Sequence, residues 1–242
     1  MRAPMRIRGL IEAMARDATL AMDGRRSLVL APHQDDEVLG CGGTIARKVR
    51  RGTPVSIAFL TDGRGGVAAA PGEARAVREA EAHRAAAALG LPPHRLAFLR
   101  YEDGRLSDYV DPASEEIRRL VSDLGVEDVF VPYRREFHGD HMAAWRIGKA
   151  SLPRHGRLYE YPIWYGPWQW RRLGGWSRLA AVGHLADAVG CVKVCVADVA
   201  DAKRLALEAY RSRLAGFESN RDWGARFLEN FSRRYELFFV GR

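Results

Sequence analysis

The hydrophobic positions of the chain alternate between short apolar runs of strand length and longer amphipathic stretches of helix length. The apolar runs occupy residues 27–32, 55–60, 95–100 and 126–132. The amphipathic stretches follow them at residues 38–51, 73–89, 111–124 and 141–151. A repeating strand–helix pattern of this kind builds parallel sheets with helices on both faces. We therefore predict an α/β fold, a Rossmann-like three-layer fold with a mostly parallel sheet.

The pattern is less regular beyond residue 150. It predicts a strand and an aromatic-rich loop over residues 157–176, a strand over 192–199, a helix over 201–217 and a short closing strand near 235–239. Because no repeat or clear linker divides the 242 residues, we expect a single domain over residues 1–242. Residues 27–150 would form its core and residues 151–242 a C-terminal elaboration.

Composition places the chain among ordinary globular proteins, with 47% hydrophobic and 28% charged residues. The net charge is +8, and the basic residues are mostly arginines scattered along the helical stretches. Such a pattern suits a solvated surface or contact with a small anion. It lacks the basic, aromatic-interleaved cluster of a nucleic-acid-binding module, so we expect no nucleic-acid partner.

The cysteine content and the N-terminal stretch indicate the cellular compartment of the protein. The three cysteines form no CxxC pair, and we expect buried apolar thiols, which favour a reducing compartment. Glu12, Arg16 and Asp17 interrupt the apolar stretch near the N-terminus, so an amphipathic surface helix explains it better than a signal peptide. No apolar run has the length of a membrane span. We expect a cytoplasmic protein.

The most informative string is APHQDDE, a polar turn that directly follows the first apolar run. It brings together His33, Asp35 and Asp36, and imidazole with carboxylate is a ligand set for divalent metals. The extra carboxylate could accept a proton from a metal-bound water. A second string, HGDH at residues 138–141, follows the run 126–132. Because ligands of doubly wound sheets bind beyond the carboxyl ends of the strands, the two strings predict one composite metal site.

Each string also has a simpler interpretation. APHQDDE alone could form a magnesium pocket of the response-regulator type. HGDH alone could be a helix cap with two surface histidines, and Asp140 is a credible N-cap. The glycines Gly40, Gly42 and Gly43 suggest a dinucleotide site, but the acidic turn before them would repel phosphate, so close helix packing explains them better.

The two strings, the TDG loop and the helix with Arg78 and Glu81 resemble the PIG-L/LmbE-like deacetylases over roughly residues 27–150. The family usually shows His-Pro-Asp-Asp-Glu, whereas here Pro32 precedes His33 and Gln34 fills the next place. The spacing from the histidine to the two aspartates is kept. The resemblance implies a zinc-dependent hydrolase that removes an N-acetyl group from an amino sugar or its conjugate by attack of an activated water on the amide.

By the same resemblance, one divalent ion, Zn²⁺ with Fe²⁺ as the alternative, would be held by His33, Asp36 and His141. The catalytic residues would be Asp35 as general base, His138 as oxyanion stabiliser or proton donor, and Asp140 as the residue that orients a histidine. Some relatives carry a tyrosine just before the HxDH string, where this chain has Glu136 and Phe137.

Substrate contacts are expected from Arg64, Arg78 and the aromatic segment, foremost Trp164, Tyr165 and Trp168. Each has an alternative: an exposed loop arginine, an Arg78–Glu81 pair on one helix, and aromatic packing. Three other functions stay open: an amidase for a larger N-acyl group or a thiol conjugate, a non-haem iron enzyme, and a non-catalytic binding protein. The strand–helix pattern opposes the iron enzyme, and Asp35 beside the ligands opposes pure binding. The oligomeric state is not predicted.

Overall fold

The computed structural model describes residues 9, 11–67, 69–163, 187, 189–212, 229 and 231–241, which form an α/β fold around one sheet. The sheet has eight strands in the order β1-β7-β8-β6-β5-β2-β3-β4. The strands are β1 (Arg16–Asp17), β2 (Ser27–Ala31), β3 (Val55–Thr61), β4 (Leu96–Tyr101), β5 (Asp128–Pro132), β6 (Arg157–Tyr161), β7 (Cys191–Cys195) and β8 (Tyr235–Val240). Strand β8 runs antiparallel to both its neighbours, β6 and β7, whereas the other neighbouring pairs are parallel. The predicted, mostly parallel sheet is confirmed.

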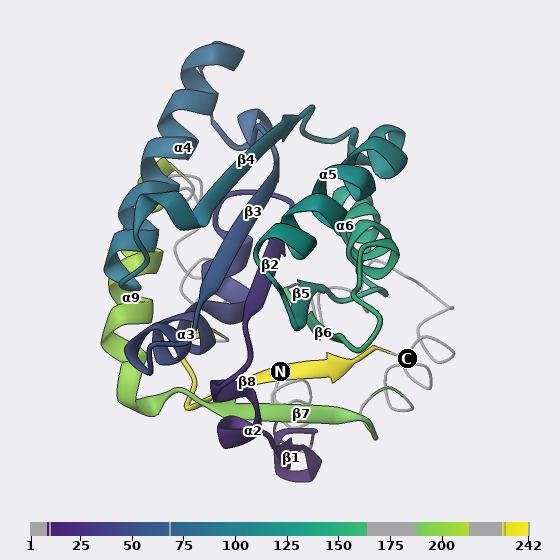
Figure 1. Cartoon of the computed structure of the whole chain (residues 1–242). Helices are drawn as coiled ribbons and strands as arrows, with labels where there is room; N and C mark the ends of the chain where they lie inside the picture. The colour runs from purple at the N-terminus through teal and green to yellow at the C-terminus, as the bar shows by residue number, and fades with distance from the viewer. Residues whose placement is uncertain are drawn as a thin grey trace, which may run out of the picture.

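Helices cover both faces of this sheet (Figure 1). The α-helices are α2 (Thr19–Asp23), α3 (Asp36–Arg50), α4 (Pro71–Ala88), α5 (Val110–Asp123), α6 (Gly139–Ala150) and α9 (Ala200–Glu208). Short 3-10 helices are η1 (Arg64–Gly66), η2 (Pro93–Arg95), η3 (Leu106–Tyr109) and η5 (Ala197–Val199). Helices α3, α4 and α9 lie on one side of the sheet and α5 and α6 on the other. None of the helices in the described part of the chain is long and apolar enough to cross a membrane.

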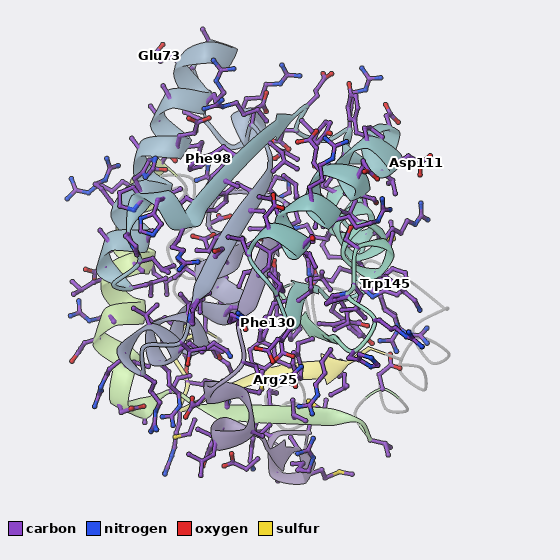
Figure 2. The ribbon with its side chains drawn as sticks, viewed as in Figure 1. Arg25, Glu73, Phe98, Asp111, Phe130 and Trp145 are labelled. Atoms are coloured by element: carbon purple, nitrogen blue, oxygen red, sulfur yellow. The ribbon has the colours of Figure 1, made fainter. Side chains whose placement is uncertain are left out.

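Two apolar clusters fill the spaces between the three layers. One joins Phe130 and Phe59 of the sheet to residues of α3, α4 and α9, and the other joins Val129 to Ile117 of α5 and Ile147 of α6. Figure 2 shows Phe130 inside the molecule. Strand β2, between these layers, is buried along its whole length, which explains its uninterrupted apolar run.

The main difference from the sequence prediction lies after β7. The strand expected over 192–199 ends at Cys195, and residues 197–199 form η5, which leads directly into α9. The apolar pattern continued past the strand because Val196 and Val199 are buried in the core as well, at 1% and 7% exposure. Helix α9 ends at Glu208, and residues 213–217 of the expected helix lie outside the described residues.

The chain order of the strands reverses at one point of the sheet. From β2 the chain proceeds outward to β3 and β4, then returns to β5 on the opposite side of β2 and continues to β6. Such a reversal separates the loops that follow the two central strands, and ligands of doubly wound folds bind there. The loops after β2 and β5 are the two polar strings.

Close packing explains the glycines of α3, as the sequence predicted. A Cβ atom added to Gly40 would lie 2.2 Å from Cδ2 of Tyr161, and one added to Gly43 would lie 2.6 Å from Cβ of Val196. Both distances are too short for real atoms, so α3 approaches β6 and the segment after β7 only because these positions lack side chains.

We expect Gly40→Ala to lower the free energy of unfolding by about 1–3 kcal/mol, because the added methyl group overpacks against the Tyr161 ring. Gly72→Ala is the matched control in α4, where nothing lies within 4 Å of an added Cβ atom. It should keep or raise stability, by up to about 1 kcal/mol. Urea unfolding of both variants measures the difference, and equal stabilities would contradict the packing explanation.

Candidate metal centre

The first polar string forms a tight turn between β2 and α3. Thr61, at the end of β3, donates both its N–H (3.0 Å) and its hydroxyl (2.7 Å) to the carbonyl of Pro32. The turn is thereby fixed to the neighbouring strand before it reaches His33. Helix α3 starts at Asp36, so the Asp36 carboxylate lies at a helix N-terminus, where the helix dipole favours negative charge.

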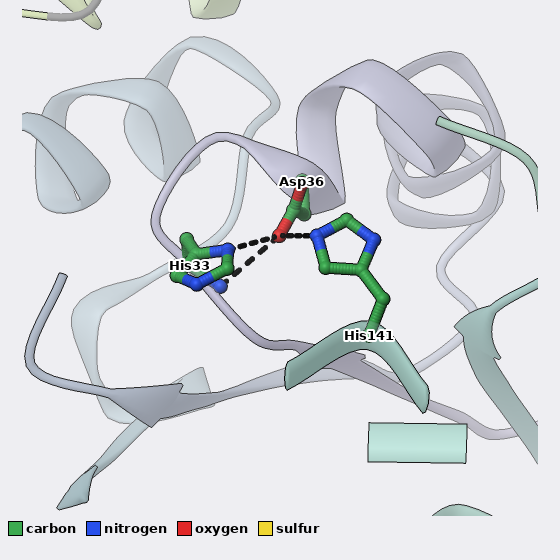
Figure 3. A group of neighbouring side chains, drawn as sticks. All are labelled: His33, Asp36 and His141. Carbon is green, nitrogen blue, oxygen red and sulfur yellow. Dashed lines mark hydrogen bonds and ion pairs between the residues drawn. The ribbon is translucent and has the colours of Figure 1, made fainter. Parts of the chain in front are cut away.

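The carboxylate of Asp36 lies between two imidazoles (Figure 3). Its Oδ2 is 3.1 Å from Nδ1 of His33 and 3.4 Å from Nε2 of His141, and it accepts the backbone N–H of His33 at 3.1 Å. The three ligand atoms lie within 4.8 Å of one another. Tetrahedral zinc with bonds of about 2.0–2.2 Å separates its ligands by about 3.3–3.6 Å. The sequence prediction that these side chains meet agrees with this geometry, and their role as metal ligands stays a prediction.

Carboxylates also contact the far side of both imidazoles. Nε2 of His33 is 3.1 Å from Oδ2 of Asp140 and 3.2 Å from Oδ1 of Asp103, and Nδ1 of His141 contacts the buried carboxylate of Glu136. In metal sites, carboxylates in this position fix the tautomer and the orientation of a ligating histidine. The contact between Asp140 and His33 fits the orienting role expected for Asp140.

The N-cap of α6 is His138 and not Asp140, which corrects the sequence prediction. Nδ1 of His138 accepts the N–H of Asp140 at 3.3 Å, and the backbone of His138 is extended. The Asp140 carboxylate instead accepts the N–H groups of Gly104 (2.8 Å) and Leu106 (3.0 Å) in the loop after β4. Because Nδ1 is an acceptor, neutral His138 carries its proton on Nε2.

The imidazoles of His33, His138 and His141 lie close together, but their pKa values shift in different directions. Ring centroids of His138 lie 4.9 Å from those of His33 and His141. Burial would lower the pKa of His33, but hydrogen bonds to Asp103, Asp140 and Asp36 raise it well above its usual value. Burial would also lower the pKa of His141, but Asp36 and Glu136 outweigh this effect and raise the pKa to about 9.

The pKa values of Asp36 and His138, the neighbours of these two imidazoles, are lowered. Burial would raise the pKa of Asp36, but His141 and His33 hold it well below its usual value. Burial, with repulsion from His141 and His33, lowers the pKa of His138 to about 4. Buried carboxylates thus stabilise the protonated forms of His33 and His141. The same negative charge would stabilise a metal cation that displaced those protons.

The general-base candidate Asp35 has an unusual backbone and a buried partner. Its φ is 140°, a value that residues with a side chain rarely adopt. Its Oδ1 lies 3.5 Å from Nη2 of Arg78, a side chain that is only 2% exposed. Arg78 also lies 3.4 Å from Glu81. The pairing of Arg78 with Glu81, the alternative to a substrate contact, is thus present in the structure. The role of Arg78 as a substrate contact stays a prediction.

The other expected substrate contacts are less informative. Arg64, in η1, is partly exposed and forms ion pairs with Asp62 and Glu102. Trp164, Tyr165 and Trp168 lie outside the described residues. Tyr161, at the end of β6, is fully buried and donates its hydroxyl to the carbonyl of Leu30 at 2.7 Å, which makes it part of the core.

Sequence reasoning missed two residues of the site, Asp103 and Glu136. Asp103 follows β4 at the same sheet edge as the other strand-end residues. Its position after a predicted strand is the sequence feature that could have identified it. Glu136 was noted only as the residue near the place of a family tyrosine. Its carboxylate accepts the N–H of Ile163 and also contacts Nδ1 of His141. Glu136 therefore links the segment after β5 to the segment after β6.

Comparisons with known proteins agree with this geometry. A model of the GlcNAc-PI de-N-acetylase (PIG-L) family matches residues 28–152. An uncharacterized deacetylase, YaiS of Escherichia coli (strain K12), is 27% identical over 141 residues, which cover 55% of this chain and 72% of the relative. A conserved Thermus thermophilus protein of known structure is 28% identical, with a TM-score of 0.61 over 88% of this chain and 93% of that chain.

The structure of N,N'-diacetylchitobiose deacetylase from Pyrococcus horikoshii has a TM-score of 0.68 at 20% identity, over 97% of this chain and 89% of that chain. At this identity the match shows a shared fold. The family match includes both polar strings and the strands that carry them. The chain therefore belongs to the PIG-L family, as its two polar strings predicted.

Proposed function

We propose that the protein is a metal-dependent N-deacetylase that releases acetate from an amino sugar or an amino-sugar conjugate. The observation that carries the proposal is the cluster of His33, Asp36 and His141, with Asp35 next to it on the same turn. Membership of the PIG-L family and the deacetylase names of YaiS and the chitobiose enzyme support the same reaction.

The donor set fits one divalent ion. Two imidazoles and a carboxylate suit Zn²⁺ and leave a fourth position open, and Fe²⁺ accepts the same set. A second set, from His33, His138 and Asp140, also brings its ligand atoms within 4.8 Å. We favour the first set because the ligand atoms of the second set already accept hydrogen bonds. The Asp140 carboxylate accepts two backbone N–H groups, and Nδ1 of His138 accepts the N–H of Asp140. When bound, the ion would lower the pKa of a water molecule and polarise the amide carbonyl.

The chain's own residues would then handle the protons and the charge. Asp35 would accept the proton of the attacking water, because its carboxylate lies on the same turn as the cluster, one residue before Asp36. His138 would donate its Nε2–H to the amide oxygen as that oxygen gains negative charge. Asp140 and Asp103 would keep His33 oriented, and Glu136 would do the same for His141.

Acetate release from a panel of N-acetylated compounds tests the proposal directly. The panel should contain N-acetylglucosamine, diacetylchitobiose, N-acetylglucosaminyl conjugates and, for each, an analogue with a longer acyl group. Zinc-loaded protein should release acetate from at least one amino-sugar compound, and His141→Ala should not. Release of longer acyl chains alone would favour the larger-acyl amidase, and no release from any compound would reject an N-deacylase.

We predict that Asp35→Asn keeps the metal but loses about a hundred- to ten-thousand-fold in kcat, because an amide cannot accept the water proton. Metal content and kcat of the purified variant, measured on one sample, check this. Asp108→Asn is a control, since Asp108 pairs on the surface with Arg105 and should leave kcat unchanged. Near-normal turnover of Asp35→Asn would place the base elsewhere.

We predict that Glu136→Gln weakens zinc binding by about 10–100-fold, because a neutral amide holds the His141 imidazole less firmly and lowers its basicity. Competition with a chelator of known affinity measures the change. The control is Glu116→Gln, whose carboxylate accepts the Tyr101 hydroxyl on the surface and should leave the affinity as it was. Equal affinities in the two variants would remove Glu136 from the metal centre.

We predict that zinc affinity rises with pH between pH 6 and 8. In the absence of metal, His141 has a pKa of about 9 and is protonated across this range, so the metal must displace its proton. Each displaced proton raises the affinity by about tenfold per pH unit. The rise should become less steep near pH 9, where His141 loses its proton even without metal. A flat chelator-competition profile from pH 6 to 8 would contradict the electrostatics described above.

A further inference from the structure

The backbone of Asp35 needs support from its surroundings. With φ at 140°, this residue adopts a conformation that L-amino acids with side chains rarely keep, and such residues persist only where neighbouring structure holds them. The carboxylate of Asp35 lies near Arg78, whereas that of Asp36 lies between the imidazoles. Two chains of buried polar contacts hold Asp35, and both lead to the same short segment after α9.

The first chain starts at the backbone of Asp35. Its N–H donates to Oε2 of Glu37 at 3.0 Å. The other oxygen of the same carboxylate, Oε1, accepts the hydroxyl of Tyr210. Glu37 is 1% exposed and Tyr210 is 2% exposed, so water does not compete for these contacts. Loss of the tyrosine hydroxyl would leave a buried carboxylate oxygen without its donor.

The second chain starts at the side chain of Asp35. The guanidinium of Arg78 lies 3.5 Å from its Oδ1 and 3.4 Å from Oε2 of Glu81. The carboxylate of Glu81 accepts the N–H (2.8 Å) and the hydroxyl (2.6 Å) of Ser212. The guanidinium also lies over the Tyr210 ring, 5.5 Å from its centroid. The two chains therefore end two residues apart in the sequence.

We propose that residues 210–212 form a positioning element for the general base, in which Tyr210 and Ser212 hold Asp35 through Glu37 and through Arg78–Glu81. The inference rests on the proposed function to the extent that Asp35 is the base. The segment lies outside the family match at residues 28–152, and it acts on Asp35 through Glu37 and through Arg78 and Glu81. Small displacements of a reacting group lower rates steeply, by about a hundredfold for 1 Å.

Tyr210→Phe tests the first chain, and Tyr133→Phe is its matched control. Tyr133 is fully buried and donates its hydroxyl to the carboxylate of Asp187 at 2.6 Å, a bond of the same kind away from Asp35. We expect Tyr210→Phe to lower kcat about tenfold or more with unchanged KM and zinc content, and Tyr133→Phe to keep kcat. Ser212→Ala, on the second chain, should lower kcat in the same direction by a smaller factor, and it tests the inference even where Tyr210→Phe does not fold.

Two further measurements separate positioning from general packing. In an Asp35→Asn background, Tyr210→Phe should cause no additional loss of rate, because its effect passes through the base. Without any substrate, NMR should show faster exchange of the Asp35 amide proton in Tyr210→Phe than in Tyr133→Phe. Equal rate losses in both backgrounds, or an unchanged Asp35 amide, would overturn the inference. If the parent protein hydrolyses nothing but the amide effect appears, the proposed function fails and the positioning element stands.

Discussion

The site depends on one carboxylate oxygen, Oδ2 of Asp36, which lies 3.1 Å from one imidazole and 3.4 Å from another. The imidazoles come from the turn after β2 and from the first turn of α6, about a hundred residues apart in the sequence, so their approach requires β2 and β5 to be neighbours. The chain reverses direction across the sheet between these two strands, the place where doubly wound folds bind their ligands. A buried carboxylate is stable there only because positive charge, from protonated histidines or a metal ion, offsets its loss of hydration.

The loop after β4 is tied to this centre from two directions. Asp140 accepts two N–H groups of the loop, and the loop's own Asp103 contacts His33. The loop also approaches β3, since the N–H of Asp103 donates to the Asp62 side chain at 3.3 Å. A register shift between β3 and β4, next to Arg100 with its φ of 61°, precedes this loop. Irregularities of this kind redirect the chain at strand ends, and here they bring a fourth carboxylate to the histidines.

Much of the fold and the centre of the site follow from sequence periodicity, because buried parallel strands and amphipathic helices have distinct patterns. His33 and His141 were identifiable because each belongs to a polar string that comes after a predicted strand and contains further metal-ligand residue types. Asp103 and Glu136 were not, since an acidic residue in a loop has the same sequence signal whether it is solvated or buried. The burial of Arg78 was equally invisible, because it depends on α9 covering α4, a contact between segments more than a hundred residues apart.

Residues of α9 and β8 also reach the middle of α3, the helix that begins at Asp36. Glu236 of β8 accepts the N–H groups of Gly43 (2.7 Å) and Thr44 (2.8 Å), and Lys203 of α9 donates to the carbonyl of Leu39 at 3.1 Å and to Glu236 at 2.6 Å. Both ions are buried, so each is stable only in the presence of the other. Helix α3 is thus fixed at its start through Tyr210 and at its middle through Lys203 and Glu236. The turn that carries Asp35 and Asp36 consequently depends on α9 and β8 for buried hydrogen bonds, and we expect these elements to fold as one cooperative unit.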